Sequence, residues 1–74
     1  MSKIYIVMGS YFTCGDVMGP DIVGVFSSHK KAVKCIVDDW KGQIILYDGN
    51  TDEYSYEDKY GDKHIRFIEE HEVK

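Results

Sequence analysis

The sequence predicts an α+β fold, in which an antiparallel β-sheet of about five strands has one helix packed across one face. Three observations support this fold class. One stretch of the 74 residues carries apolar side chains at helical spacing, several short stretches are rich in β-branched and aromatic residues, and the last connections are short enough for hairpins. The expected element order is β-β-α-β-β-β. Residues 1–74 are predicted to form a single small domain, because independent domains usually have at least about 50 residues.

The first strand is predicted from Ile4, Ile6 and Met8, which alternate with Tyr5 and Val7. Residues 9–20 contain three glycines and the only proline of the chain, so we expect a long loop there. Residues 21–26 return to a strand-like composition and form the second predicted strand.

A helix is predicted to follow Ser27 and Ser28, either of which can cap its first turn, and Gly42 can adopt the left-handed conformation beyond its end. Its apolar residues recur three and four positions apart. The stripe consists of Ala32, Val33, Ile36, Val37 and Trp40. We expect the stripe to cover a sheet face formed by Ile4, Ile6, Val23, Val25, Ile45 and either Ile65 or Phe67.

Three more strands are predicted in the second half of the chain. The third lies within residues 43–47, and the sequence Asp48-Gly49-Asn50 predicts a hairpin turn to the fourth, which includes Tyr54 and Tyr56. Residues 60–62 form a second predicted turn, and residues 64–68 form the fifth strand. An acidic tail, residues 69–72, is expected to follow it.

The charge balance bears on the class of partner. Thirteen acidic and nine basic residues give a formal charge of −4, which disfavours attraction to phosphate backbones and anionic lipids, so neither direct nucleic-acid binding nor membrane binding is expected. The chain shows no signal peptide or membrane-spanning run, so a cytoplasmic location is predicted, in the host cell if a phage encodes it. There Cys14, in the loop, and Cys35, in the core, are expected to be free thiols.

Catalytic, metal-binding and cofactor-binding motifs are not recognisable in the sequence. Adjacent carboxylates point in different directions on a helix or strand, and Cys14 lacks the motif of an activated nucleophile, so we do not expect an enzyme. Asp48, Asn50 and Asp52 match the start of a calcium-binding loop, but Glu53 stands where that loop needs glycine and Lys59 where it needs glutamate. We therefore predict no metal and no cofactor.

The segment 47–62 combines carboxylates with tyrosines, and this pattern suits docking to a basic host protein or protein complex. The alternative is a solvated hairpin whose tyrosines pack on the sheet. The residues predicted to bind the partner are Asp52, Glu53, Tyr54, Tyr56, Glu57, Asp58, Tyr60 and Asp62.

A second function, from another class, is the binding or sequestration of a nucleotide-like signal. In it the 9–20 loop closes over the ligand, and the start of the helix meets the phosphates, with a homodimer as one possible assembly. The residues predicted for this site are Tyr11, Phe12, His29, Lys30 and Lys31. A third alternative is a self-associating module that uses an edge strand.

The first half of the chain carries a strand, a serine cap and a helix start in Val23-Gly24-Val25-Phe26-Ser27-Ser28 and Lys31-Ala32, after an opening Lys3-Ile4-Tyr5-Ile6-Val7. This part resembles small uncharacterised α+β proteins of bacteria and their phages. In size and acidity the chain also looks like phage-encoded inhibitors of host defence, including anti-CRISPR proteins. The resemblance implies a phage or mobile-element accessory factor that inhibits a host defence protein or a nucleic-acid-binding protein without catalysis, and it carries no catalytic residues.

Overall fold

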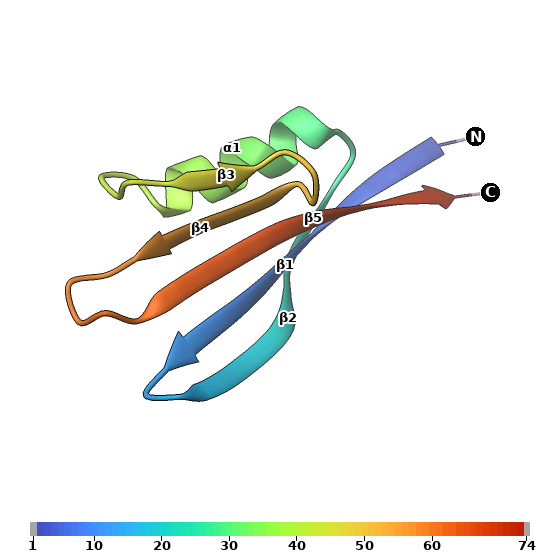
Figure 1. The fold of residues 1–74 in the computed structure, drawn as a ribbon. Helices are drawn as coiled ribbons and strands as arrows, with labels where there is room; N and C mark the ends of the chain where they lie inside the picture. Colours follow the sequence, from blue (N-terminus) through green and yellow to red (C-terminus); the bar gives the residue numbers. More distant parts are fainter. Residues whose placement is uncertain (1, 74) are drawn as a thin grey trace.

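The structure is a computed structural model that describes residues 2–73, and it has a five-stranded antiparallel sheet with one helix (Figure 1). The sheet order is β2-β1-β5-β4-β3, so both chain ends lie on the central strands, side by side. The elements are β1 (Ser2–Thr13), β2 (Asp16–Phe26), α1 (His29–Asp39), β3 (Leu46–Asp48), β4 (Glu53–Glu57) and β5 (Lys63–Val73). This confirms the predicted order of elements. Helix α1 is not long and apolar enough to cross a membrane.

The prediction of a loop over residues 9–20 is wrong. In the structure, β1 and β2 continue through these residues as one long hairpin. The hairpin turns at Cys14 and Gly15, whose φ angles of 48° and 85° are both positive, as a two-residue type I′ turn requires. Two register shifts in the β1–β2 pairing absorb the irregular backbone near the glycines. Pro20 is tolerated because β2 is an edge strand.

Helix α1 begins as predicted, after Ser28. The hydroxyl of Ser28 accepts a hydrogen bond from the backbone N–H of Lys31 at 3.2 Å. The helix ends at Asp39, Trp40 occupies the C-cap, and Gly42 has a φ of 89°. Cys35 is only partly buried on this helix, whereas Cys14 is exposed at the hairpin tip.

Two boundaries in the second half differ from the prediction. β3 starts at Leu46 instead of residue 43 and is only three residues long. β5 continues to Val73, so the predicted acidic tail is strand, and each of its residues pairs with β1. Because β1 is long enough to pair with residues 69–73, β5 continues beyond the apolar segment from which its length was predicted.

The helix packs on different strand residues from those predicted. Side chains alternate along a strand, and β1 is apolar on both sides, so the sequence pattern alone could not select the face that meets the helix. Tyr5 and Val7 point to the helix, whereas Ile4 and Ile6 point away. The buried core consists of Val7, Ala32, Ile36, Trp40 and Ile68, with Tyr5, Phe26, Val33, Ile45, Tyr54 and Tyr56 packed around it.

Of the predicted helix stripe, Val37 is 46% exposed and lies outside this core. Of the predicted sheet residues, only Ile45 packs against it, while Val23 and Val25 are exposed. Helix α1 packs over Val7 and Ile68, which lie in the middle of β1 and β5, and the hairpin end of β1 and β2 extends away from it (Figure 1).

Candidate functional site

The turn between β4 and β5 is built around the carboxylate of Asp58. One oxygen accepts hydrogen bonds from the backbone N–H groups of Tyr60, at 2.9 Å, and Asp62, at 3.1 Å, and the other lies 3.0 Å from Nε2 of His64. The hydrogen bond with His64 is the main cause of a lowered pKa for Asp58, and the two backbone hydrogen bonds lower this pKa further. Asp58 therefore shapes the turn.

A lowered pKa makes Asp58 a source of pH-dependent stability. Its contribution is present above the unfolded-state pKa of about 3.9 and is lost as the pH falls through the lower, folded-state value. We expect Asp58→Asn to lower the free energy of unfolding at pH 7 and to flatten its dependence on pH below about pH 4. Urea unfolding between about pH 2 and pH 7 measures both effects. Asp38→Asn, at an exposed helix position, should leave the fall in the free energy of unfolding below about pH 4 as it is in wild type. An equal fall in wild type and in Asp58→Asn would contradict the prediction.

A row of aromatic rings crosses the sheet beside this turn. The ring of His64 on β5 lies between Tyr11 on β1 and Tyr56 on β4, with ring centroids 4.7 Å and 4.5 Å apart, and it is stacked on Tyr56. The hydroxyl of Tyr11 donates a hydrogen bond of 2.7 Å to Asp62, and this bond raises the pKa of Tyr11. Tyr56 in turn packs edge-on against Trp40. The row ties three strands to the end of the helix.

Asp52 plays a similar part at the turn between β3 and β4. Its carboxylate lies 2.6 Å from Nε2 of His29 and 3.5 Å from the hydroxyl of Tyr47, so it connects this turn to the start of α1. The rings of Tyr47 and Tyr54 are 4.7 Å apart, and burial is the main cause of a raised pKa for Tyr54. These contacts hold the short strand β3 in place.

The eight residues predicted to bind a partner therefore do not form one free surface. Tyr54 and Tyr56 pack against the core, and the three aspartates are hydrogen-bonded within the protein. Tyr60 is 77% exposed, with Lys59 5.1 Å from its ring centre. The two glutamates, Glu53 and Glu57, lie on the sheet face that points away from the helix core. The alternative prediction for this segment, in which its tyrosines pack on the sheet, is correct for Tyr54 and Tyr56.

The five residues predicted for a nucleotide-like ligand are also separated. Tyr11 and Phe12 are neighbours on β1 and point to opposite faces of the sheet. His29 lies at the other end of that strand, 5.9 Å from the ring of Tyr5, and Lys30 and Lys31 are exposed beside it. Tyr5 and Tyr11 are six positions apart on the strand, a distance of about 20 Å. The helix start therefore cannot share a small ligand with Tyr11.

The sheet face opposite the helix core was missed as a site, although it carries ten apolar side chains. We call it the open face. Strand pairing places Met8 between Ile22 and Phe67, and Val25 beside Ile6. Its exposed members include four residues between 55% and 65% exposed, namely Val17, Ile22, Val25 and Leu46. The complete apolar set is Ile4, Ile6, Met8, Phe12, Val17, Ile22, Val25, Leu46, Ile65 and Phe67.

Carboxylates border the open face on the side of β3 and β4. Glu53 pairs with Phe67 and with Asp48, and Glu57 pairs with Lys63, so these side chains share the face. Glu69 on β5 is the pairing partner of Ile6 on β1, so it also lies on this face. The open face therefore combines apolar side chains with four carboxylates, one lysine and His71, whose Nε2 lies 3.1 Å from the carboxylate of Glu69. The alternation of residues along β1 indicated two apolar faces, but it did not indicate which of the two the helix covers.

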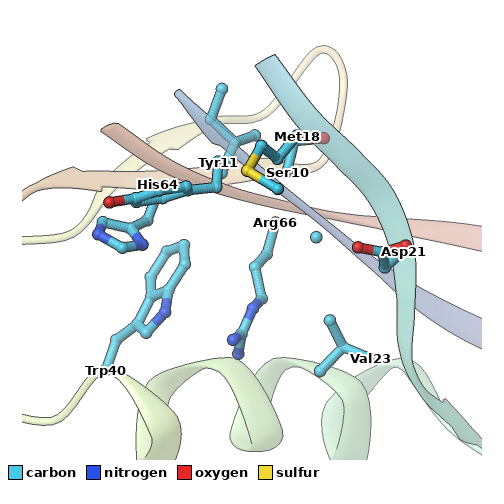
Figure 2. Close-up of a pocket in the computed structure, with 10 residues that line it drawn as sticks. Ser10, Tyr11, Met18, Asp21, Val23, Trp40, His64 and Arg66 are labelled. Atoms are coloured by element: carbon cyan, nitrogen blue, oxygen red, sulfur yellow. The ribbon is translucent and has the colours of Figure 1, made fainter. Parts of the chain in front are cut away.

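A groove of about 270 Å³ opens on the helix side of the sheet, near the end of α1 (Figure 2). In Figure 2, Arg66 lies in the middle of the view, with Trp40 and His64 on one side of it, and Asp21 and Val23 of β2 face it from the other. Met18 and Tyr11 lie near one end, and the backbone of Gly9 contributes to the lining. Of these residues, only Tyr11 belongs to the ligand site predicted from the sequence. Within residues 2–73, no group of three or more His, Cys, Asp or Glu side chains is arranged to hold a metal ion.

These features define a small, mainly β domain with one helix, an acid-bordered apolar sheet face and a groove on the other side. The chain belongs to the family described as "Domain of unknown function (DUF7336)", whose family model matches residues 2–74. Searches of curated proteins and of solved structures found no match.

Proposed function

We propose that this chain is a non-enzymatic protein-binding module that holds a basic partner protein on its open face. One observation carries the proposal: ten apolar side chains of one sheet face have no covering layer within residues 2–73. Sheets normally bury an apolar face against a second layer. Contiguous exposed apolar surface of this kind, bordered by polar residues, is typical of a protein interaction site.

The charge at the border selects the class of partner. Asp48, Glu53, Glu57 and Glu69 share this face with two basic residues, Lys63 and His71, and His71 contacts Glu69. Such a border attracts Lys- and Arg-bearing proteins and raises their association rate, whereas it repels nucleic acid. The border keeps Glu53 and Glu57 of the predicted partner-binding residues, whereas the three aspartates of that set are hydrogen-bonded within the protein.

The flat area of the face approaches the size of a specific interface. Five strands spaced about 4.8 Å apart over about eight residues of about 3.3 Å each cover roughly 600 Å² before the relief of the side chains is counted. Stable interfaces bury about 800 Å² on each partner. A second copy of the chain would bring the same carboxylates to the interface, and like charges brought together there cost several kcal/mol. A basic partner is therefore favoured over a homodimer.

The proposal extends to inhibition of a host defence protein or nucleic-acid-binding protein by a phage or mobile-element factor. Proteins that bind phosphate backbones present Lys and Arg in grooves or stripes, and an acidic, apolar-centred surface competes for such grooves. The size, the acidity and the resemblance noted in the sequence support this extension.

The test compares capture of a partner by the tagged full chain and by matched variants. We expect wild type to retain a basic protein at low salt and to release it at high salt, because part of the attraction is electrostatic. Ile22→Asp, in the apolar centre, and the double change Glu53→Lys with Glu57→Lys, at the border, should each weaken capture at least about tenfold.

Two controls separate the open face from general surface effects. Ile44→Asp changes an isoleucine that is 86% exposed outside the face, and the double change Glu70→Lys with Glu72→Lys reverses the charge of two exposed carboxylates of β5. Both should leave capture unchanged. Equal loss in the test and control variants would reject the open face, and a dimer of the isolated protein disrupted by Ile22→Asp would replace the basic partner with a second copy.

A further inference from the structure

The groove beside α1 has two walls of opposite charge, and it is separate from the open face because it lies on the other side of the sheet. Gly9 on β1 is the direct pairing partner of Asp21 on β2, and the lining also includes Arg66 from β5. Asp21 is exposed and takes part in none of the ion pairs among residues 2–73. Its carboxylate is therefore available to a ligand.

The missing side chain of Gly9 keeps the groove open. A Cβ atom at this position would lie 2.9 Å from Cγ2 of Val23 and 3.6 Å from Nε of Arg66. The two walls thus stand on either side of a residue that has no side chain of its own. Any larger residue at position 9 would reduce the space between them.

Arg66 is held in place before any ligand binds. Its Nη1 donates a hydrogen bond to Asp39, and its guanidinium lies 5.1 Å from the ring centre of Trp40. The side chain is only 19% exposed. A guanidinium has five N–H donors in a rigid fork, so donors remain for a planar acceptor such as a carboxylate.

The remaining lining is apolar or aromatic. Met18 and Tyr11 lie near one end of the groove, with Val23 and Trp40 along its sides (Figure 2). The volume of about 270 Å³ lies just below the roughly 300 Å³ at which small-molecule sites begin. The groove therefore has room for one small molecule with an apolar part.

We propose that the groove binds a free α-amino acid with an apolar or aromatic side chain. The ligand's carboxylate meets Arg66, its ammonium group meets Asp21, and its side chain contacts Met18, Val23 and Trp40. A zwitterion matches a lining that has one positive and one negative group on facing walls. A nucleotide would bring two or more negative charges to a groove whose only full cation already contacts Asp39.

The experiment is an NMR titration of the isotope-labelled full chain with L-phenylalanine, N-acetyl-L-phenylalanine and L-phenylalanine amide. We expect saturable shifts of the amide signals of Gly9, Asp21 and Arg66 with the free amino acid, with a Kd on the order of 0.1–1 mM. Each blocked derivative lacks one of the two charges, so it should bind at least about tenfold more weakly.

Variants of the two walls complete the test. Asp21→Asn should reduce the affinity for L-phenylalanine to that for its N-acetyl derivative and leave the latter unchanged, because both lack the ammonium–carboxylate contact. Gly9→Ala should weaken the binding of all three probes, because the added methyl group would occupy the floor of the groove. Asp16→Asn, at an exposed position of the same strand, should change nothing.

The proposal fails if L-phenylalanine gives no saturable shift, if all three probes bind equally, or if Asp21→Asn binds L-phenylalanine as wild type does. Dispersed amide spectra of the variants establish that each one is folded. Loss of partner capture by open-face variants tests the other side of the sheet, so the two proposals succeed or fail separately.

Discussion

Ile36→Ala is expected to lower the free energy of unfolding by about 2–5 kcal/mol. Ile36 has no exposed surface and is, with Val7, among the largest fully buried side chains. Its removal leaves a cavity where the helix meets the central strands. A domain of this length has a total stability of roughly 4–11 kcal/mol, so the variant should be partly unfolded at modest urea concentrations.

The matched control is Ile44→Ala, which makes the same chemical change at a position that is 86% exposed. It should change the free energy of unfolding by less than about 0.5 kcal/mol. Urea unfolding, followed by the fluorescence of Trp40, the only tryptophan, measures both variants. Similar losses at positions 36 and 44 would show that α1 does not bury Ile36 as described.

The element order could be predicted because local patterns determine it. Ser28 caps the helix through its own hydroxyl, and Ile36 and Trp40 lie on the buried side because of their spacing. The packing face of the sheet could not be predicted in this way. Ile4 and Ile6 are as apolar as Tyr5 and Val7, and only the pairing of Val7 with Ile68 on β5 brings the second set to the helix.

The candidate sites show the same division between local and distant information. The acidic character of a partner surface follows from composition, but the roles of Asp52 and Asp62 depend on residues distant in sequence, namely His29 and Tyr11. The hydrogen bond between Tyr11 and Asp62 spans 51 positions. The groove likewise needs Asp21 and Arg66, which meet only because β2 and β5 flank β1.

The second large effect is expected for Gly19→Ala, which should lower the free energy of unfolding by about 2–4 kcal/mol. Gly19 has a φ of 93°, a left-handed conformation that L residues rarely adopt. A Cβ atom there would lie 2.7 Å from the carbonyl oxygen of Gly9 and 3.2 Å from the backbone nitrogen of Asp21. These are backbone atoms, so relief of the contact requires β2 to move away from β1.

Gly15→Ala separates the two contributions to this loss. Gly15 has a similar φ of 85°, but its Cβ would have no neighbour within 4 Å, so this variant should lose only the conformational part, about 1–2 kcal/mol. Urea unfolding of both variants gives the difference, and equal losses would contradict the close approach of the strands at Gly19. Gly19 lies in the chain between Met18 and Asp21, which line the groove. Gly19→Ala should therefore also weaken amino-acid binding, whereas Gly15→Ala, at the hairpin tip, should not.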